Sequence, residues 1–501
     1  MITNVLQYLR KSVDKYPDKM ALIDENKSVT FKEINDRAMR LASCILAQCG
    51  EIYNMPIAVY MDKSVDSIIS FMGILYSGNF YVPIDKKSPQ ERINRILEVL
   101  APVAIITQGE QPDDLKKWKN IDYEDSKETF FDEEKMLTHL KHVLDVDPVY
   151  VLFTSGSTGI PKGVAINHKS VIDYTEWLHN QFRFDDQTIF GEQAPFYFDN
   201  SILDIYSTLK NSATMVIIPE RLFIFHNKLF EFLNEYKINT IFWVPSALIG
   251  VANSGVLERE RLMYMEKVLF CGEVMPNKQL NLWRKEYPDL LYANLYGPTE
   301  ITDVCTYYVV DREFQDDEPL PIGKACENTQ VLILDDDNLL AKEGEIGELC
   351  VRGSCLSLGY YNDFRKTDQV FVQNPLNNRY YEKIYKTGDL ARVNSLGELI
   401  YIGRKDFQIK HQGHRIELGE IETNVYSIEG VHQNCALYYA EQNKIILFYS
   451  GEDTLSEKDV YMKMLQKIPK YMMPEVIYKI PKFPLNINGK IDRVKLRSLM
   501  K

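Results

Sequence analysis

The sequence predicts an α/β fold in which a large, layered N-terminal domain precedes a small α+β C-terminal domain. Over the first 300 residues, short apolar runs that end in Pro or Gly alternate with segments of helical apolar spacing. This alternation is typical of buried, mostly parallel strands between helices. From about residue 320 the apolar runs alternate with turn residues, as in hairpins. At 501 residues, the chain also exceeds what one hydrophobic core supports.

The N-terminal part contains the clearest helix and strand signals. SIISFMGILYSG at 67–78 predicts a helix that ends at Gly78, and the next residues, NFYVPID, resemble a strand. VYVLF at 149–153 predicts a buried strand. Further buried strands are expected where short apolar runs end in Pro or Gly, and a helix is expected between two of them. These strands are 214–219, 239–245 and 267–272, and the helix is 226–237.

The C-terminal third changes its pattern twice. Hairpin-like runs give a β-rich subdomain, which we assign to the N-terminal domain; they lie at 331–340, 344–353 and 397–404. ELGEIETNVYSI at 417–428 then predicts a helix in a compact mixed segment. We therefore expect an N-terminal domain of residues 1–403 and a C-terminal domain of residues 404–501.

Composition limits the classes of function. The net charge of −13 argues against a nucleic-acid-binding protein, which needs basic surface. The eight cysteines show no CxxC and no zinc spacing, so reduced, buried thiols are expected. The N-terminus carries charges throughout, unlike a signal peptide. The sequence contains no run of 18 apolar residues, so no membrane span is expected. We expect a cytoplasmic protein that binds neither nucleic acid nor membrane.

The segment LFTSGSTGIPKG at 152–163 has the composition of an anion-holding loop. Its glycines allow close backbone approach, its hydroxyls and backbone N–H groups donate hydrogen bonds, and Lys162 adds a charge. Pro161 and Gly163 distinguish the segment from the P-loop of NTPases. The alternative is an ordinary Gly/Ser turn between strands. The hydroxyl and glycine candidates are Thr154, Ser155, Gly156 and Thr158.

Three further segments carry candidate chemistry. In NLYGPTE at 294–300, Glu300 is a natural Mg²⁺ ligand beside phosphate, although Thr299 and Glu300 also suit a helix N-terminus. In YKTGDLAR, Asp389 suits the hydroxyls of a ribose, or an ordinary turn. In NGKIDR, Lys490 follows an Asn-Gly turn, where a surface lysine is the alternative.

Taken in order, these motifs resemble the adenylate-forming ligase superfamily over essentially the whole chain. The matching segments are LFTSGSTGIPKG, FYFDNSILDIYSTL, FCGEVMP, NLYGPTE, YKTGDLAR, GRKDFQIKHQGHRIELGEIE and NGKIDR. The superfamily includes acyl-CoA synthetases, luciferases and the amino-acid adenylation domains of nonribosomal peptide synthetases. The resemblance implies an ATP- and Mg²⁺-dependent enzyme and the adenylate-forming ligase fold, whose small C-terminal domain is mobile.

The resemblance also implies a role for each matching residue. Thr154, Ser155, Gly156, Thr158 and Lys162 would hold the triphosphate of ATP. Thr299 and Glu300 would act at the α-phosphate and at Mg²⁺, and Lys490 would bridge the attacking carboxylate and the α-phosphate. The remaining nucleotide contacts would come from Asn294 and Tyr296 at the adenine, from Asp389 at the ribose, and from Tyr401 and Arg404. Asp406 matches the hinge between the two domains.

Asp199 in FDNS resembles the aspartate that pairs with the α-amino group in amino-acid adenylation domains. A partly buried carboxylate favours a cation, and the substrate ammonium supplies one. Within this branch the chain resembles the stand-alone ligases that load D-alanine onto a carrier protein. The residues expected to bind the amino acid are Asp199, Asn200, Leu203, Phe242, Leu269, Cys271, Leu295, Asp303 and Val304.

Asp303 in EITDVCTYY departs from the branch, which usually has an apolar residue there. Asp303 either meets a hydroxyl or cation on the substrate side chain, or caps a turn and faces away from the substrate. The first alternative argues against plain alanine as the substrate.

The expected activity is formation of an aminoacyl-AMP and pyrophosphate from an amino acid and ATP, followed by transfer to a phosphopantetheine thiol. Because the sequence ends at Lys501, shortly after NGKIDR, we expect the thiol on a separate carrier protein. Three alternatives are a ligase specific for D-alanine, an acyl-CoA synthetase that uses another carboxylic acid, and a non-catalytic nucleotide-binding module. Asp199 argues against the acyl-CoA synthetase, and retention of Lys162, Glu300, Asp389 and Lys490 argues against the non-catalytic module.

Overall fold

The computed structural model describes residues 2–156, 160–405, 408–484 and 491–498. Their contacts divide the chain into two compact units. Unit 1 comprises Met1–Ile84, Leu100–Leu152 and Gly163–Lys405, and unit 2 comprises Asp85–Val99, Phe153–Lys162 and Asp406–Lys501. Two segments from early in the chain therefore join the C-terminal residues, so the boundary expected after residue 403 stays a prediction.

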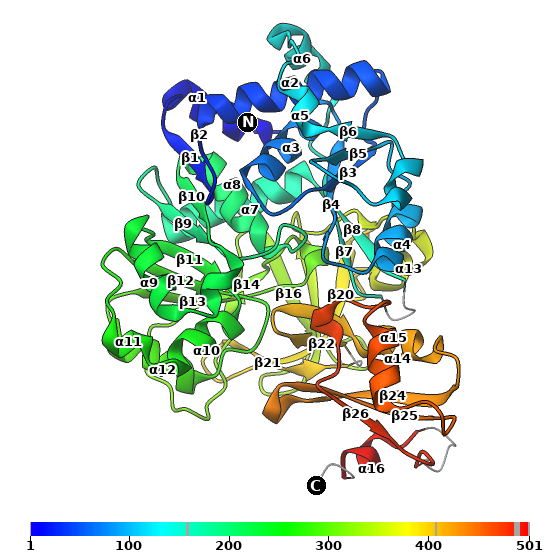
Figure 1. The fold of residues 1–501 in the computed structure, drawn as a ribbon. Coiled ribbons are helices and arrows are strands. Elements are labelled where there is room, and N and C mark those ends of the chain that lie inside the picture. The colour runs from blue at the N-terminus through cyan, green and yellow to red at the C-terminus, as the bar shows by residue number, and fades with distance from the viewer. Residues whose placement is uncertain (1, 157–159, 406–407, 485–490, 499–501) are drawn as a thin grey trace. The chain divides into compact units, whose positions relative to one another are not determined.

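A mostly parallel sheet forms the first layer of unit 1, as the sequence predicts. In the described part of the chain its nine strands have the order β15-β14-β13-β12-β11-β9-β10-β1-β2 (Figure 1). The strands from β13 to β1 in this order are parallel, whereas β2, β14 and β15 pair antiparallel. The bounds are β1 Met20–Ile23, β2 Ser28–Thr30, β9 Ile189–Glu192, β10 Thr214–Ile217, β11 Thr240–Trp243, β12 Lys267–Phe270, β13 Leu291–Tyr296, β14 Thr306–Val309 and β15 Lys324–Ala325.

A second sheet has the order β18-β8-β7-β4-β3-β5-β6 among the described residues. Its strands β7 and β8 flank the candidate phosphate loop. The bounds are β3 Pro56–Tyr60, β4 Phe80–Pro83, β5 Ala104–Thr107, β6 Asn120–Asp122, β7 Pro148–Thr154, β8 Lys162–Asn167 and β18 Gly359–Tyr360.

Helices pack against the first sheet and form two apolar cores with it. One core gathers buried residues of both sheets and of α1, α2, α3, α7 and α8, among them Leu203 and Leu269. The other core contains residues of α9, α10, α11 and α12, which lie beside β11, β12 and β13 in Figure 1. The helices of unit 1 are α1 Leu6–Lys15, α2 Phe31–Cys49, α3 Val65–Tyr76, α5 Tyr123–Ser126, α6 Glu133–His139, α7 His168–Phe182, α8 Asn200–Asn211, α9 His226–Glu235, α10 Pro245–Asn253, α11 Val256–Arg259, α12 Asn277–Glu286 and α13 Phe364–Val370.

The β-rich part of unit 1 is antiparallel, which confirms the predicted hairpins. Its described strands have the order β16-β17-β20-β19, and β21 pairs with β20. Tyr296, Leu349 and Tyr385 lie in its core, so the core joins this sheet to the end of β13. The bounds are β16 Thr329–Leu334, β17 Gly347–Gly353, β19 Phe371–Gln373, β20 Lys383–Val393 and β21 Leu399–Arg404.

Unit 2 combines helices with a three-stranded sheet of order β24-β25-β26 and a separate hairpin, β22-β23. The predicted helix at 417–428 is α14, and its Ile421 and Val425 pack in the core of this unit. The bounds are α4 Gln90–Leu100, β22 Gln408–His411, β23 His414–Glu417, α14 Leu418–Tyr426, β24 Val431–Tyr439, β25 Lys444–Gly451, α15 Glu457–Met464, β26 Val476–Lys479 and α16 Arg493–Ser498.

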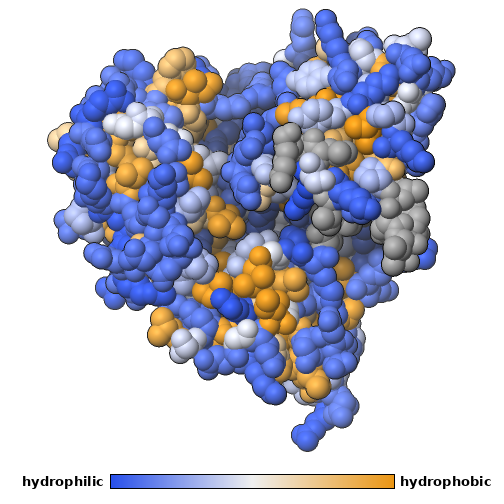
Figure 2. Space-filling view, turned by 90° about the horizontal axis from the view of Figure 1, so that it is seen from below, coloured by the Kyte–Doolittle hydropathy of each residue, from blue (hydrophilic) through white to orange (hydrophobic). Residues whose placement is uncertain are grey.

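Hydrophilic residues cover most of the face in Figure 2, and its hydrophobic residues form separate patches. No helix among the described residues is both long and apolar enough to cross a membrane.

Candidate active site

Asp389 lies at the centre of the candidate nucleotide site. It is on β20, paired across the sheet with Arg404 of β21. Arg404 Nη1 donates to Asp389 Oδ1 at 2.9 Å and to the carbonyl of Thr387 at 2.8 Å, and the hydroxyl of Tyr296 donates to Asp389 Oδ2. Burial raises the pKa of Tyr296 well above its usual value, and Asp389 raises it further, so Tyr296 remains the donor. Two predicted nucleotide-binding residues, Arg404 and Tyr296, therefore both contact a third, Asp389.

Tyr401 and Asn294 lie next to this group. The ring of Tyr401 is 6.1 Å from that of Tyr296, with the two planes tilted by 42°. Asn294 precedes Tyr296 by two residues on β13, and its side-chain amide donates to the carbonyl of Pro321 at 2.8 Å. The end of β13 thus supplies two of the predicted adenine contacts.

Glu300 is completely buried in a short 3₁₀ turn, η4 (Thr299–Ile301). Pro298 precedes this turn and Thr299 lies inside it, so Thr299 is not the cap of a helix. A Cβ atom at Gly297 would clash with the carbonyl oxygen of Asp303, which explains the glycine. The hydroxyl of Tyr360 donates to Glu300 Oε1 at 2.8 Å.

The candidate phosphate loop contacts α14 and the strand before it, all within unit 2. The hydroxyl of Ser155 donates to the carbonyl of Arg415 at 2.8 Å, and Gly156 N–H donates to Glu420 Oε2 at 3.1 Å. Lys162 Nζ lies 3.9 Å from Glu417 Oε1, and the hydroxyl of Thr154 donates to the carbonyl of Lys162 at 3.4 Å. In this conformation, these described donors of the loop already contact carboxylate or carbonyl oxygens, so binding phosphate through them would exchange those contacts.

Three residues with predicted roles lie outside the described residues. They are Thr158 of the phosphate loop, Asp406 of the hinge and Lys490. Their roles remain predictions from the sequence.

The apolar residues predicted to bind the amino acid share one core. Phe242 on β11 pairs with Leu269 on β12, and Leu269 pairs with Ala293 on β13. Side chains two residues apart on a strand point to the same face, which places Cys271 and Leu295 beside this row. The adjoining core contains their chain neighbours Trp243 and Phe270. The core that α8 shares contains Leu203, Phe242, Leu269, Cys271, Leu295 and Val304.

Asp199 immediately precedes α8 and is half-buried. Its side chain does not cap the helix, although an acid at a helix N-terminus is favoured by the helix dipole. Asn200 is buried, and its Nδ2 has no hydrogen-bond partner among the described residues. Leu203, one turn further along, enters the shared core. The acid Asp199 therefore lies at the N-terminal end of α8. One turn further along the same helix, the apolar side chain of Leu203 packs in that core.

Asp303 is 1% exposed and accepts a hydrogen bond from Tyr174 at 2.6 Å. Burial raises the pKa of Tyr174 well above its usual value, and the negative charge of Asp303 raises it further. Tyr174 is therefore the donor. Thr302 and Asp303 both have positive φ, at 64° and 72°, a conformation that non-glycine residues adopt mainly where neighbouring structure holds them. The carboxylate thus faces the protein interior.

Two buried acids were missed by the sequence reasoning. Lys63 Nζ lies 2.5 Å from Glu192 Oε2, but burial still raises the pKa of Glu192 to about 7. Asp204, four residues after Asn200 on α8, has no hydrogen-bond partner among the described residues for either oxygen. Burial raises the pKa of Asp204 well above its usual value, and the nearby Glu192 raises it further. An acid inside the apolar run ILDIY was the available signal.

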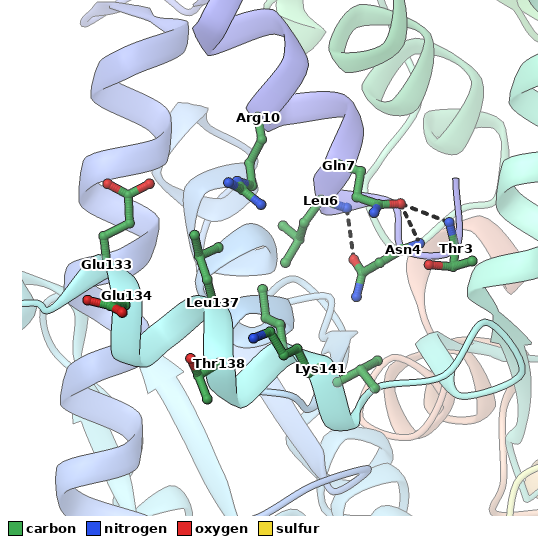
Figure 3. Close-up of a pocket in the computed structure, with 12 residues that line it drawn as sticks. Thr3, Asn4, Leu6, Gln7, Arg10, Glu133, Glu134, Leu137, Thr138 and Lys141 are labelled. Atoms are coloured by element: carbon green, nitrogen blue, oxygen red, sulfur yellow. Dashed lines mark hydrogen bonds between the residues drawn. The ribbon is translucent and has the colours of Figure 1, made fainter. Parts of the chain in front are cut away.

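A surface cavity of about 830 Å³ lies away from all these residues, between α1 and α6. Figure 3 shows Leu6, Gln7 and Arg10 of α1 on one side and Leu137 and Thr138 of α6 on the other. None of the predicted site residues lines it.

Residues 9–361 match the family model of the AMP-binding enzymes. The chain belongs to this family. Members of the AMP-binding family use ATP, and the chain is accordingly a ligase. It is 30% identical to the D-alanine–D-alanyl carrier protein ligase of Bacillus cytotoxicus, with 99% of each chain covered. It is 31% identical to zwittermicin A synthase ZmaJ of Bacillus cereus (100% and 95% covered) and 31% identical to gramicidin S synthase 1 of Brevibacillus brevis, over 98% of this chain and 44% of that one.

Solved structures show that this AMP-binding enzyme has the adenylate-forming ligase fold. PA1221, a nonribosomal peptide synthetase protein with adenylation and carrier domains, aligns with a TM-score of 0.84 and 24% identity, covering 100% of this chain and 98% of that one. The Vibrio cholerae adenylation domain AlmE, in complex with glycyl-adenosine-5′-phosphate, aligns with a TM-score of 0.83 and 21% identity, again covering 100% and 98%.

Proposed function

We propose that this AMP-binding enzyme activates an amino acid as its adenylate and transfers the aminoacyl group to a phosphopantetheine thiol on a separate carrier protein. In the first step a carboxylate oxygen of the amino acid attacks the α-phosphorus of ATP, the bond to the bridging oxygen breaks, and pyrophosphate leaves. In the second step the thiol sulfur attacks the carbonyl carbon, AMP leaves, and the thiol proton is released. The carrier-ligase and peptide-synthetase relatives support both steps.

The observation that carries this proposal is the position of Asp199 at the start of α8. Its carboxylate would pair with the substrate ammonium, and the core that contains Leu203, Cys271 and Leu295 would supply apolar contacts to the side chain. A simple carboxylic acid offers Asp199 no cation, so its binding gains no charged hydrogen bond there, a contact worth about 1.5–3 kcal/mol. An amino acid is therefore the better substrate.

The residues around Asp389 fit the nucleotide. Asp389 would accept the ribose hydroxyls, Arg404 and Tyr296 hold its carboxylate, and Tyr401 and Asn294 would complete the adenine side. Thr154, Ser155, Gly156, Thr158 and Lys162 would bind the phosphates.

Glu300 fits a magnesium ion because Mg²⁺ prefers hard oxygen ligands and is commonly held by one or two carboxylates together with phosphate oxygens. When bound, Mg²⁺ neutralises phosphate charge. Thr299 would contact the α-phosphate, and Lys490 would bridge it to the attacking carboxylate. We propose residues 404–501 as the domain that turns about Asp406 between the two steps.

The test is amino-acid-dependent exchange of labelled pyrophosphate into ATP, run over D- and L-amino acids, followed by loading of a purified holo-carrier protein. We expect exchange with at least one amino acid and no exchange with the corresponding acids that lack the amine. Product formation with free coenzyme A and a fatty or aryl acid, without exchange by any amino acid, would contradict the proposal.

We propose that the carboxylate of Asp303 binds a hydroxyl, amide or cationic group on the substrate side chain. Because φ at Asp303 is 72°, a β-branched replacement such as valine would add backbone strain. Asp303→Asn avoids this, since asparagine tolerates positive φ; it keeps the shape of the side chain and removes the charge and one acceptor oxygen. We expect kcat/KM for the native substrate, relative to alanine, to fall by about 10- to 100-fold, because sites built around a polar partner discriminate strongly.

The ranking of amino acids by pyrophosphate exchange, before and after Asp303→Asn, checks this expectation. Asn338, an exposed asparagine with φ of 60°, gives the control variant Asn338→Asp, which makes the reverse change on the surface and should preserve the ranking. An unchanged ranking in Asp303→Asn would remove Asp303 from the side-chain site.

A further inference from the structure

Tyr360 is a buried tyrosine that contacts the carboxylate of Glu300. Its hydroxyl donates to Glu300 Oε1 at 2.8 Å, Glu300 is completely buried, and Tyr360 is 6% exposed. A hydrogen bond from a hydroxyl to an ionised carboxylate is among the stronger ones in proteins. The bond at Oε1 restricts the rotation of the Glu300 carboxylate and so orients both of its oxygens.

The backbone around Tyr360 holds this contact in place. Tyr360 lies on β18, paired with Val164 of β8, the strand that follows the phosphate loop. The amide of Tyr360 donates to the hydroxyl of Thr367 at 2.9 Å, and its ring makes an edge contact with Phe371. The hydroxyl of Tyr360 therefore comes from a fixed strand and not from a mobile loop.

The same segment also contacts the turn that carries Glu300. Ser357 N–H donates to the carbonyl of Glu300 at 3.0 Å, and the hydroxyl of Thr302 donates to the carbonyl of Cys355 at 2.9 Å. Thr302 has φ of 64°, so the turn adopts a conformation that surrounding contacts must stabilise. Residues 355–360 thus hold both the backbone and the side chain of Glu300.

We infer that Tyr360 is a positioning residue for Glu300, one that fixes the Glu300 carboxylate for Mg²⁺ in the MgATP complex. The inference rests on the role of Glu300 given under the proposed function. Hydrogen-bond partners of metal ligands orient the ligand and raise metal affinity, and their loss costs about 10- to 100-fold in metal affinity.

The test is Tyr360→Phe, which keeps the ring and removes only the hydroxyl. Calorimetric titration of ATP into the intact protein at a series of Mg²⁺ concentrations, without amino acid, gives the Mg²⁺ dependence of binding independently of turnover. We expect Tyr360→Phe to need about 10- to 100-fold more Mg²⁺ for half-maximal enhancement. ATP affinity in excess EDTA should stay within about twofold of the unmodified protein, since Tyr360 acts only through the metal ligand.

Tyr292→Phe is the matched control, because Tyr292 is equally buried and its hydroxyl donates to the carbonyl of Tyr287 at 2.9 Å, in the other core. Its Mg²⁺ dependence should not change. All titrations are run below the melting range of each variant, so that a loss of stability does not imitate a loss of Mg²⁺ binding.

Glu300→Gln separates the inference from the proposal on which it rests. If Glu300→Gln raises the Mg²⁺ requirement and Tyr360→Phe behaves as Tyr292→Phe does, the role of Tyr360 is wrong and that of Glu300 stands. If Glu300→Gln leaves the Mg²⁺ dependence unchanged, Glu300 is not the ligand and both are wrong. Equal weakening of ATP binding by Tyr360→Phe with and without Mg²⁺ would reduce Tyr360 to a general structural role.

Discussion

Replacing Lys490 by alanine is expected to lower the rate of aminoacyl-adenylate formation by about 10²–10⁴-fold. Under the proposed function, Lys490 would contact both the attacking carboxylate and the α-phosphate. Negative charge is shared between these groups as the new bond forms, and a fixed ammonium lowers its energy most in the transition state. Amino-acid-dependent pyrophosphate exchange measures the effect directly.

The second half-reaction gives the internal control for Lys490. Thioester formation from supplied aminoacyl-AMP and holo-carrier protein should be nearly unchanged, because the domain of residues 404–501 is proposed to have turned and withdrawn Lys490 by then. The external control is Lys495→Ala, which removes an exposed lysine that contacts Asp492 at 3.5 Å. Equal loss in both half-reactions would contradict the proposed turn of residues 404–501 between the two steps.

The layered part of the fold was predictable because its signals are local. The helix expected at 67–78 is α3 at Val65–Tyr76, and the strand expected at 267–272 is β12 at Lys267–Phe270. Apolar side chains with helical spacing, and short apolar runs before Gly or Pro, report burial within one element. The composition of unit 2 was not predictable, because contacts between residues 153–162 and residues 406–501 join segments that no local pattern relates.

The site divides in the same way. The motifs that contain Asp389 and Glu300 resemble family motifs in the sequence, so these residues could be proposed for the site, whereas the groups that contact them in the fold could not. Tyr360 is 60 residues from Glu300, and Tyr174 is 129 residues from Asp303. From the sequence alone, either tyrosine is interpreted as a core residue. Only the fold shows that its hydroxyl donates a hydrogen bond to a buried carboxylate. Residues proposed to touch the ligand can thus be named from sequence motifs, whereas the side chains that contact them become known only from the structure.

Replacing Asp199 by alanine is expected to lower kcat/KM for the amino acid by roughly 10²–10³-fold or more, because the substrate ammonium loses its charged partner. ATP affinity should not change, since the residues proposed to bind the nucleotide around Asp389 are on β20, β21 and β13, whereas Asp199 immediately precedes α8. Asp199→Asn keeps the shape and removes the charge, so it should show most of the same loss. Asp289→Ala removes an exposed acid and is the control.

The decisive experiment compares the rate of pyrophosphate exchange with each amino acid to the rate with the same carboxylic acid lacking the amine. In the unmodified enzyme the amine should strongly favour exchange, whereas in Asp199→Ala the preference should shrink or reverse, because an unpaired ammonium is then costly to bury. A lower rate with an unchanged preference would mean that Asp199 acts on the chemistry or the fold and not on the ammonium. Full activity of Asp199→Ala with its amino acid would make the ammonium assignment wrong and an uncharged carboxylic acid the better substrate.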